Sequence, residues 1–176
     1  MSKNIKNNVA YVINCINEIS GKRPGKKVLQ KIVFLIQEKG VDLNFEYGLH
    51  FYGPYSGGLD GETTFLNADG IIKLDCSGYS HLMSINDEVF YIESNNLTDK
   101  QKETICGLIY HFKDRTPAEL ELLTTALYAY NHLQNKTEDS IISGVQKIKG
   151  SKYSINQIRE SLKEFSYFNK TLTKNN

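Results

Sequence analysis

The stretch Lys27-Val28-Leu29-Gln30-Lys31-Ile32-Val33-Phe34-Leu35 predicts the helix around which the rest of the sequence can be ordered. Leu29, Ile32 and Val33 recur three and four residues apart and therefore share one face of a helix, which Ile36 extends. Lys27 and Lys31 stand four apart on another face, with Gln30 beside them. Gly40 is typical of a helix C-terminus.

A second helix is predicted before this one, over residues 4–19. Apolar residues recur there at helical spacing, namely Ile5, Val9, Val12, Ile13, Ile16 and Ile19. Ser20-Gly21 ends this helix, and the basic loop Lys22-Arg23-Pro24-Gly25-Lys26-Lys27 leads into the next.

Downstream, the pattern predicts a short strand, a helix and a hairpin. Aromatic residues alternate over residues 46–55, and Gly53-Pro54 is expected to break that strand. A helix over 56–67 and strands over 71–76 and 79–85 follow, and residues 89–92 add a third short strand. Two helices, a strand, a helix and a hairpin are the order of a winged helix, with the hairpin as the wing.

The remaining residues are predicted to be helical, over 99–112, 117–133, 138–148 and 154–168. Thr116-Pro117-Ala118-Glu119 combines an N-cap, a proline at the first helical position and a capping-box glutamate. The sequence therefore predicts one α+β, mostly helical domain over 1–176. It has a winged-helix-like part at 1–95 with a small β-hairpin sheet, packed C-terminal helices at 96–170 and a frayed polar tail at 171–176.

Composition indicates a cytoplasmic protein without a membrane span. The 176 residues carry a formal net charge of +1, and no apolar run approaches the ~20 residues that a span needs. The N-terminus lacks the continuous apolar stretch of a signal peptide.

The chemistry-bearing residues form no recognisable catalytic or metal-binding pattern. Cys15, Cys76 and Cys106 are widely spaced without a Cys-x-x-Cys pair, which excludes a disulfide framework, and Cys15 and Cys106 are expected to be small buried hydrophobes. None of the four histidines forms an i, i+4 ligand pair: His50, His81, His111 and His132. Nucleophile-elbow and phosphate-loop motifs are absent, so we expect no enzyme, metal or cofactor.

Charge is unevenly distributed along the chain. Residues 1–40, 41–145 and 146–176 carry net charges of +6, −10 and +5. Basic ends around an acidic middle predict either a directional electrostatic surface or ends that fold against the middle and pair with it.

Two segments together carry a resemblance to a known family. The helix Leu29-Gln30-Lys31-Ile32-Val33-Phe34, followed by Phe51-Tyr52-Gly53-Pro54-Tyr55-Ser56, resembles the bacterial YwgA-like group. That group is similar to the Panacea (SocA-like antitoxin) domain, in which a Lys-Leu-x-Lys-Leu-x-Tyr helix precedes a Tyr-Gly-Pro motif. The resemblance covers roughly residues 5–165. It implies a non-catalytic protein of toxin–antitoxin or anti-defence type that binds and occludes a protein partner, a toxin or a defence or regulatory protein.

Tyr52 and Tyr55 are the candidate partner-binding residues. The segment from Tyr52 to Tyr55 is predicted to be a rigid turn between strand and helix, because Gly53 permits unusual backbone angles and Pro54 fixes φ. Either Tyr52 packs into the core at a structural corner, or Tyr55 is an exposed recognition aromatic.

The alternative function is a winged-helix regulator that binds nucleic acid. Its candidate phosphate contacts are Lys22, Arg23, Lys26, Lys27 and Lys31, so binding should fall steeply with salt. Asp75, Asp87 and Glu88, in or beside the predicted wing, argue against it. An apolar terminal helix would also allow a homodimer.

Overall fold

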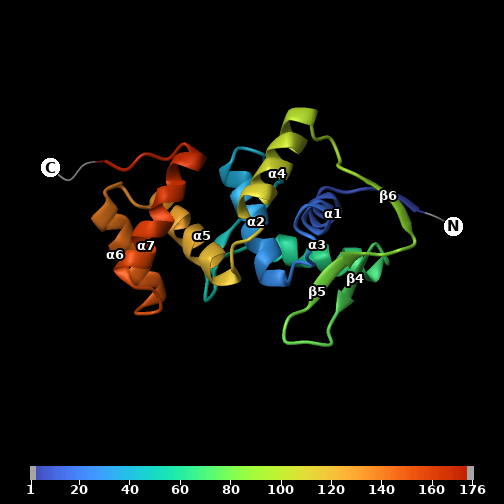
Figure 1. Cartoon of the computed structure of the whole chain (residues 1–176), viewed down its shortest axis with the longest axis horizontal. Helices are drawn as coiled ribbons and strands as arrows, with labels where there is room; N and C mark the ends of the chain where they lie inside the picture. Colours follow the sequence, from blue (N-terminus) through green and yellow to red (C-terminus); the bar gives the residue numbers. More distant parts are fainter. Residues whose placement is uncertain (1–2, 174–176) are drawn as a thin grey trace. The chain divides into compact units, whose positions relative to one another are not determined.

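Most of the described residues, 3–173, are in helices (Figure 1). The chain, seen in a computed structural model, divides into two compact units. Unit 1 contains the residues up to Gly48 together with Ser56–Arg115, and unit 2 contains Leu49–Tyr55 together with the residues from Thr116 onward. The predicted α+β, mostly helical class is confirmed, whereas this division differs from the expected change at residues 95–96.

Four helices build unit 1: α1 (Asn8–Ser20), α2 (Lys26–Glu38), α3 (Gly57–Ala68) and α4 (Asp99–Phe112). The apolar face predicted for α2 is buried. The predicted start of the first helix at residue 4 is wrong, because the side chain of Asn7 caps α1 by accepting from the N–H groups of Val9 and Ala10. α4 packs on α1 and α2, so it belongs to unit 1 rather than to a separate C-terminal part.

The predicted hairpin of unit 1 is confirmed. β4 (Ile72–Asp75) pairs antiparallel with β5 (Leu82–Ile85), with Ile72 opposite Ile85. The basic loop runs beside β5, because the N–H of Met83 donates to the carbonyl of Pro24 over 2.9 Å. The strands predicted over 71–76 and 79–85 are thus both present, each shorter than expected.

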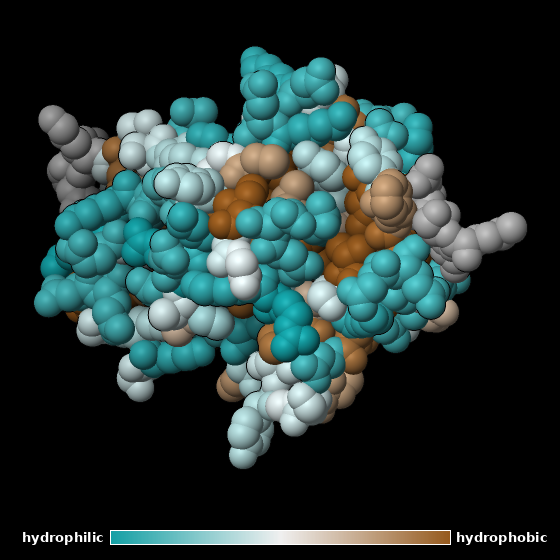
Figure 2. Space-filling model, turned by 45° about the vertical axis from the view of Figure 1, so that its right-hand side comes forward, coloured by the Kyte–Doolittle hydropathy of each residue, from teal (hydrophilic) through white to brown (hydrophobic). Residues whose placement is uncertain are grey.

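Unit 1 contains a second pair of strands, of which the sequence predicts only one. β6 (Val89–Glu93) pairs in parallel with β1 (Lys3–Lys6), which lies where a helix was expected. β6 carries the exposed aromatics Phe90 and Tyr91. Figure 2 shows hydrophobic surface, in brown, toward the right of the view, on the side of unit 1 where Figure 1 labels β6.

Gln30 joins α2 to the start of α3. Its buried amide donates from Nε2 to the carbonyl of Ser56 and accepts at Oε1 from the N–H of Ser56, both over 2.9 Å. The hydroxyl of Ser56 in turn accepts from the N–H of Leu59 and caps α3. The Gln30 side chain of α2 thus provides the hydrogen-bond partners for both the buried N–H and the buried carbonyl of Ser56, directly before α3 begins.

Unit 2 contains α5 (Pro117–His132), α6 (Glu138–Lys149), α7 (Ile155–Leu162) and the 3-10 helix η1 (Lys163–Phe168). Capping boxes open α5 at Thr116 and α7 at Ser154, as the sequence predicts for α5. The predicted helix 154–168 is α-helical only to Leu162 and continues as η1.

A short hairpin from the first half of the sequence also belongs to unit 2. β2 (Gly48–His50) pairs with β3 (Gly53–Tyr55), so the turn is Phe51-Tyr52. The expected break at Gly53-Pro54 is therefore wrong, because both residues lie in β3. Gly53 has φ 85°, a left-handed value that glycine adopts readily, directly after the two-residue turn.

The tail predicted to be frayed from residue 171 is attached over its first three residues. The Tyr130 hydroxyl donates to the carbonyl of Thr171 over 3.1 Å, and the N–H of Thr173 donates to the carbonyl of Lys136 over 3.0 Å. Residues 174–176 of that prediction lie outside the described residues. Among residues 3–173, no helix combines the length and apolar character needed to cross a membrane.

Replacing Gln30 should destabilise unit 1. Gln30→Ala leaves the buried N–H and carbonyl of Ser56 without their partner, which should lower the free energy of unfolding by about 2–4 kcal/mol. Urea unfolding measures this loss. Asn67→Ala, at an exposed position near the end of α3, is the control and should change stability by less than about 0.5 kcal/mol. Equal stability of the two variants would contradict the proposed role of Gln30.

Candidate functional site

Three of the five predicted phosphate contacts form ion pairs with acidic residues of unit 1. Arg23 Nη1 lies 3.0 Å from Asp75 Oδ2, and Lys26 pairs with Asp60. Lys22 Nζ lies 3.7 Å from Asp114 Oδ1 and donates to the carbonyl of Lys113 over 3.2 Å. The basic N-terminal segment thus pairs at these positions with the acidic middle of the chain, the second of the two predicted arrangements.

The structure does not support Lys31 as a phosphate contact. Lys31 lies on α2 and is only 2% exposed, so its ammonium is not available to a phosphate at the surface. Lys27 is partly buried. The pKa of Asp75 is lowered by hydrogen bonds from Ser77 and by Arg23, so this partner of the basic loop stays charged at neutral pH.

The hairpin Leu49–Tyr55 presents a different surface. Phe51 is 80% exposed and Tyr52 is 49% exposed at its two-residue turn, and Leu49 is also exposed. Tyr52 is therefore not the buried corner residue that one of the two interpretations expected. Tyr55 is partly buried, and its ring lies 5.1 Å from the ring of His50 between centroids.

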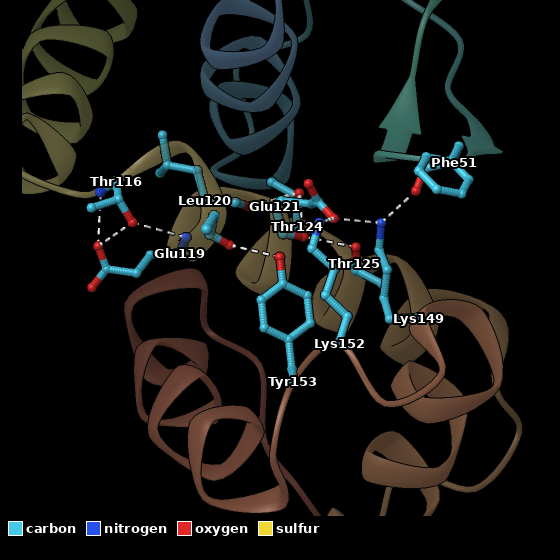
Figure 3. A network of polar contacts seen from close by, with 11 residues as sticks. Phe51, Thr116, Glu119, Leu120, Glu121, Thr124, Thr125, Lys149, Lys152 and Tyr153 are labelled. Atoms are coloured by element: carbon cyan, nitrogen blue, oxygen red, sulfur yellow. Dashed lines mark hydrogen bonds and ion pairs between the residues drawn. The ribbon is translucent and has the colours of Figure 1, made fainter.

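A buried lysine holds the turn of this hairpin. Lys149 Nζ donates to the carbonyl of Phe51 and to Glu121 Oε1, both over 2.8 Å (Figure 3). The side chains of Lys149 and Glu121 are 3% and 1% exposed. Lys152 Nζ approaches the same carboxylate oxygen to 2.6 Å from a more exposed position. One carboxylate on α5 therefore fixes, through Lys149 of α6, the backbone at the tip of the hairpin.

The local sequence explains how Glu121 is positioned. The capping box of Thr116 and Glu119 opens α5 at Pro117, four residues before Glu121, and β3 packs on α5. The hydroxyl of Thr125 donates to the carbonyl of Glu121, and Tyr153 donates to the carbonyl of Ala118 (Figure 3). Burial raises the pKa of Tyr153. The first of these hydrogen bonds lies within α5, and the second ties the start of that helix to the residue just before α7.

The electrostatics keep Glu121 ionised. Burial by itself raises the pKa of this carboxyl, but the hydrogen bonds from Lys149 and Lys152 and their positive charges outweigh it and lower the pKa to about 2. The hydrogen bond to Glu121 also raises the pKa of Lys152. A buried carboxylate that stays charged at neutral pH can hold the two lysines in place but cannot donate a proton.

Sequence reasoning missed Phe51, Glu121 and Lys149. Glu121 interrupts the apolar run Leu120-Glu121-Leu122-Leu123, and an acidic residue inside such a run was the available signal. Its partner could not be identified in that way, because Lys149 lies 28 positions away and Phe51 lies 98 positions from Lys149.

The fold and this site define an α+β, mostly helical protein that displays an aromatic hairpin anchored by a buried ion pair. Among residues 3–173, no group of three or more His, Cys, Asp or Glu side chains is arranged to hold a metal ion. No protein-family model matches the chain, and no curated protein is significantly similar to it.

Removing the charge of Glu121 should destabilise unit 2. Glu121→Gln leaves the Lys149 ammonium buried without its counter-ion, so the free energy of unfolding should fall by about 3–5 kcal/mol. Glu138→Gln is the matched control, because Glu138 pairs with Arg159 over 2.7 Å at the surface and should cost less than about 1 kcal/mol. Denaturant unfolding of both variants is the measurement, and similar small losses would show that the buried pair is dispensable.

The same carboxylate should make stability fall in acid. Its pKa in the folded protein, about 2, lies below the ordinary value of 4.5, so its stabilising contribution is complete above pH 4.5 and is lost as the pH falls toward 2. Thermal unfolding between pH 6 and pH 2 should therefore show a smaller decrease for Glu121→Gln than for the wild type. Parallel curves would contradict the assignment.

Proposed function

We propose that this protein is a non-catalytic binding module that presents the hairpin Leu49–Tyr55 to a protein partner. The observation that carries the proposal is the 80% exposure of Phe51 at a turn whose backbone is held by buried Lys149. Exposed aromatic side chains on an ordered support are typical of residues that dominate the energy of an interface. Because the turn is already fixed, binding loses little conformational freedom.

The chemistry of the hairpin describes the partner's site. Phe51 supplies an apolar ring without a polar group, whereas Tyr52 adds a hydroxyl beside it. A partner should therefore offer an apolar pocket with a hydrogen-bonding group at its rim. The resemblance to YwgA-like and Panacea-like proteins favours a toxin or a defence or regulatory protein, whose active surface the module would occlude.

Nucleic-acid binding is the weaker alternative. Arg23 and Lys26 pair with Asp75 and Asp60, and Lys31 is buried, so most of the cations on which that hypothesis depended are already matched or inaccessible. Fluorescence anisotropy with random duplex DNA at low and moderate salt separates the two functions. Salt-sensitive binding that is lost in a Lys22→Glu/Arg23→Glu variant would favour the regulator.

Position-specific crosslinking tests the hairpin as the binding surface. A photoreactive phenylalanine analogue at position 51 should crosslink one defined protein in the native host, and the same analogue at Tyr79, another exposed aromatic, should not. With that partner purified, Phe51→Ala should weaken binding by about 30-fold or more, as for a dominant interface residue. Phe65→Ala, at an exposed aromatic of α3, is the control and should leave affinity unchanged. Equal crosslinking from positions 51 and 79, or equal affinity of both alanine variants, would contradict the proposal.

A further inference from the structure

Strand β6 has one edge that no other strand covers. It pairs in parallel with β1, and within the described part of the chain no further strand or bridge pairs with it. The N–H of Asn7 donates to the carbonyl of Glu93 over 3.0 Å, so the N–H and C=O groups of Glu93 face β1. Because these groups alternate between the two edges of a strand, those of Tyr91 also face β1, whereas those of Phe90 and Ile92 face the uncovered edge.

The residues of β6 favour pairing at this edge. Its first four residues are all β-branched or aromatic, and it contains neither lysine nor proline, which commonly protect an edge strand from pairing. Its one charged residue, Glu93, already has a counter-ion, because Lys6 Nζ lies 3.3 Å from Glu93 Oε2. Phe90 is 84% exposed and Tyr91 is 57% exposed. An uncovered edge with exposed aromatics is a template for another strand.

We propose that β6 pairs antiparallel with β6 of a second copy of this chain, with Tyr91 on the two-fold axis. In an antiparallel pair, two opposed residues direct their N–H and C=O groups either both toward each other or both away. Phe90, whose groups face the uncovered edge, must therefore lie opposite Phe90, Ile92 or Ser94 of the second copy.

Two of these three registers run past an end of β6. With Phe90 opposite Phe90, the carboxylate of Glu93 lies opposite that of Asp87, which precedes the strand, and like charges directly across a pair are destabilising. With Phe90 opposite Ser94, the pairing extends beyond Glu93, where the strand ends.

The remaining register pairs all five residues of β6 with β6 of the second copy. Phe90 lies opposite Ile92 at two symmetric positions, Tyr91 lies opposite its own copy, and Val89 lies opposite Glu93. Each Phe90–Ile92 pair exchanges both of its backbone hydrogen bonds, and the two Tyr91 rings meet on the other face of the sheet. The strand is therefore complementary to itself, as a two-fold symmetric interface requires.

Pairing in this register buries the exposed aromatics of unit 1. The two-stranded sheet of each copy becomes half of a four-stranded sheet in the order β1–β6–β6–β1, and sheets of three or more strands are more stable than isolated pairs. The interface lies in unit 1, so it is independent of the function proposed for the hairpin of unit 2.

Sedimentation equilibrium of the purified whole chain tests the dimer. The wild type should show a monomer–dimer equilibrium that depends on concentration. Phe90→Lys puts two charges into the interface and should weaken the dimer by about 10-fold or more, with no loss of melting temperature for the monomer because Phe90 is exposed. Phe65→Lys, at an exposed aromatic of α3, is the control and should leave the equilibrium unchanged.

Two outcomes of sedimentation would overturn the proposal. One is a chain that stays monomeric at every concentration, even if β6 is then found to pair with an extended peptide of another protein. The other is an equal effect of Phe90→Lys and Phe65→Lys on the dimer.

Disulfide crosslinking tests the register, in a Cys76→Ser background that removes the exposed thiol. Tyr91→Cys places two cysteines at a non-hydrogen-bonded pair, where Cα atoms about 4.5 Å apart allow a disulfide. Phe90→Cys places them on a diagonal about 7–8 Å apart, beyond that reach. Under mild oxidation only Tyr91→Cys should give a covalent dimer on a non-reducing gel. Equal crosslinking of both variants, crosslinking of Phe90→Cys alone or crosslinking of neither would overturn the register.

Discussion

The stability of unit 2 depends on one buried negative charge, the carboxylate of Glu121. Moving a carboxylate out of water costs several kcal/mol, and the cost is offset only if cations and hydrogen-bond donors surround it closely. Glu121 meets that condition at one of its two oxygens, Oε1, which lies 2.8 and 2.6 Å from the ammonium groups of Lys149 and Lys152. The first of them also holds the carbonyl of Phe51, so the arrangement that keeps the carboxylate charged also fixes the turn of the hairpin. Stability and presentation of the aromatic surface rest on the same atoms.

The ion pairs of the two units have different consequences. Arg23–Asp75 and Lys22–Asp114 lie at the surface of unit 1, where solvent and salt screen them and each contributes little to stability. They nevertheless alter the charge of the surface, because each acidic partner offsets a cation that the sequence alone suggests is available to bind phosphate. Linear charge blocks therefore describe this protein poorly, because the sign of a surface depends on which blocks fold together.

Local patterns predicted much of the fold and little of the site. Helices such as α4 and α5 carry their own boundaries in caps and periodicity, and the β4–β5 hairpin is formed by neighbouring segments. The contacts that matter most for the site join distant residues: Glu121 with Lys149, and Lys149 with Phe51. Periodicity shows that a residue faces a core but does not show which distant residue it meets there. The parallel pairing of β1 with β6 escaped prediction for the same reason.

The path of the chain between the units has a consequence for biosynthesis. The chain enters unit 2 at Leu49, returns to unit 1 at Ser56, and enters unit 2 again at Thr116. During translation the hairpin leaves the ribosome well before α5 and α6, which supply its buried contacts. Its aromatic turn is therefore exposed without support until the C-terminal helices have been made. A fragment ending at Arg115 would keep the sequence of the hairpin but lack the carboxylate and the lysine that hold it.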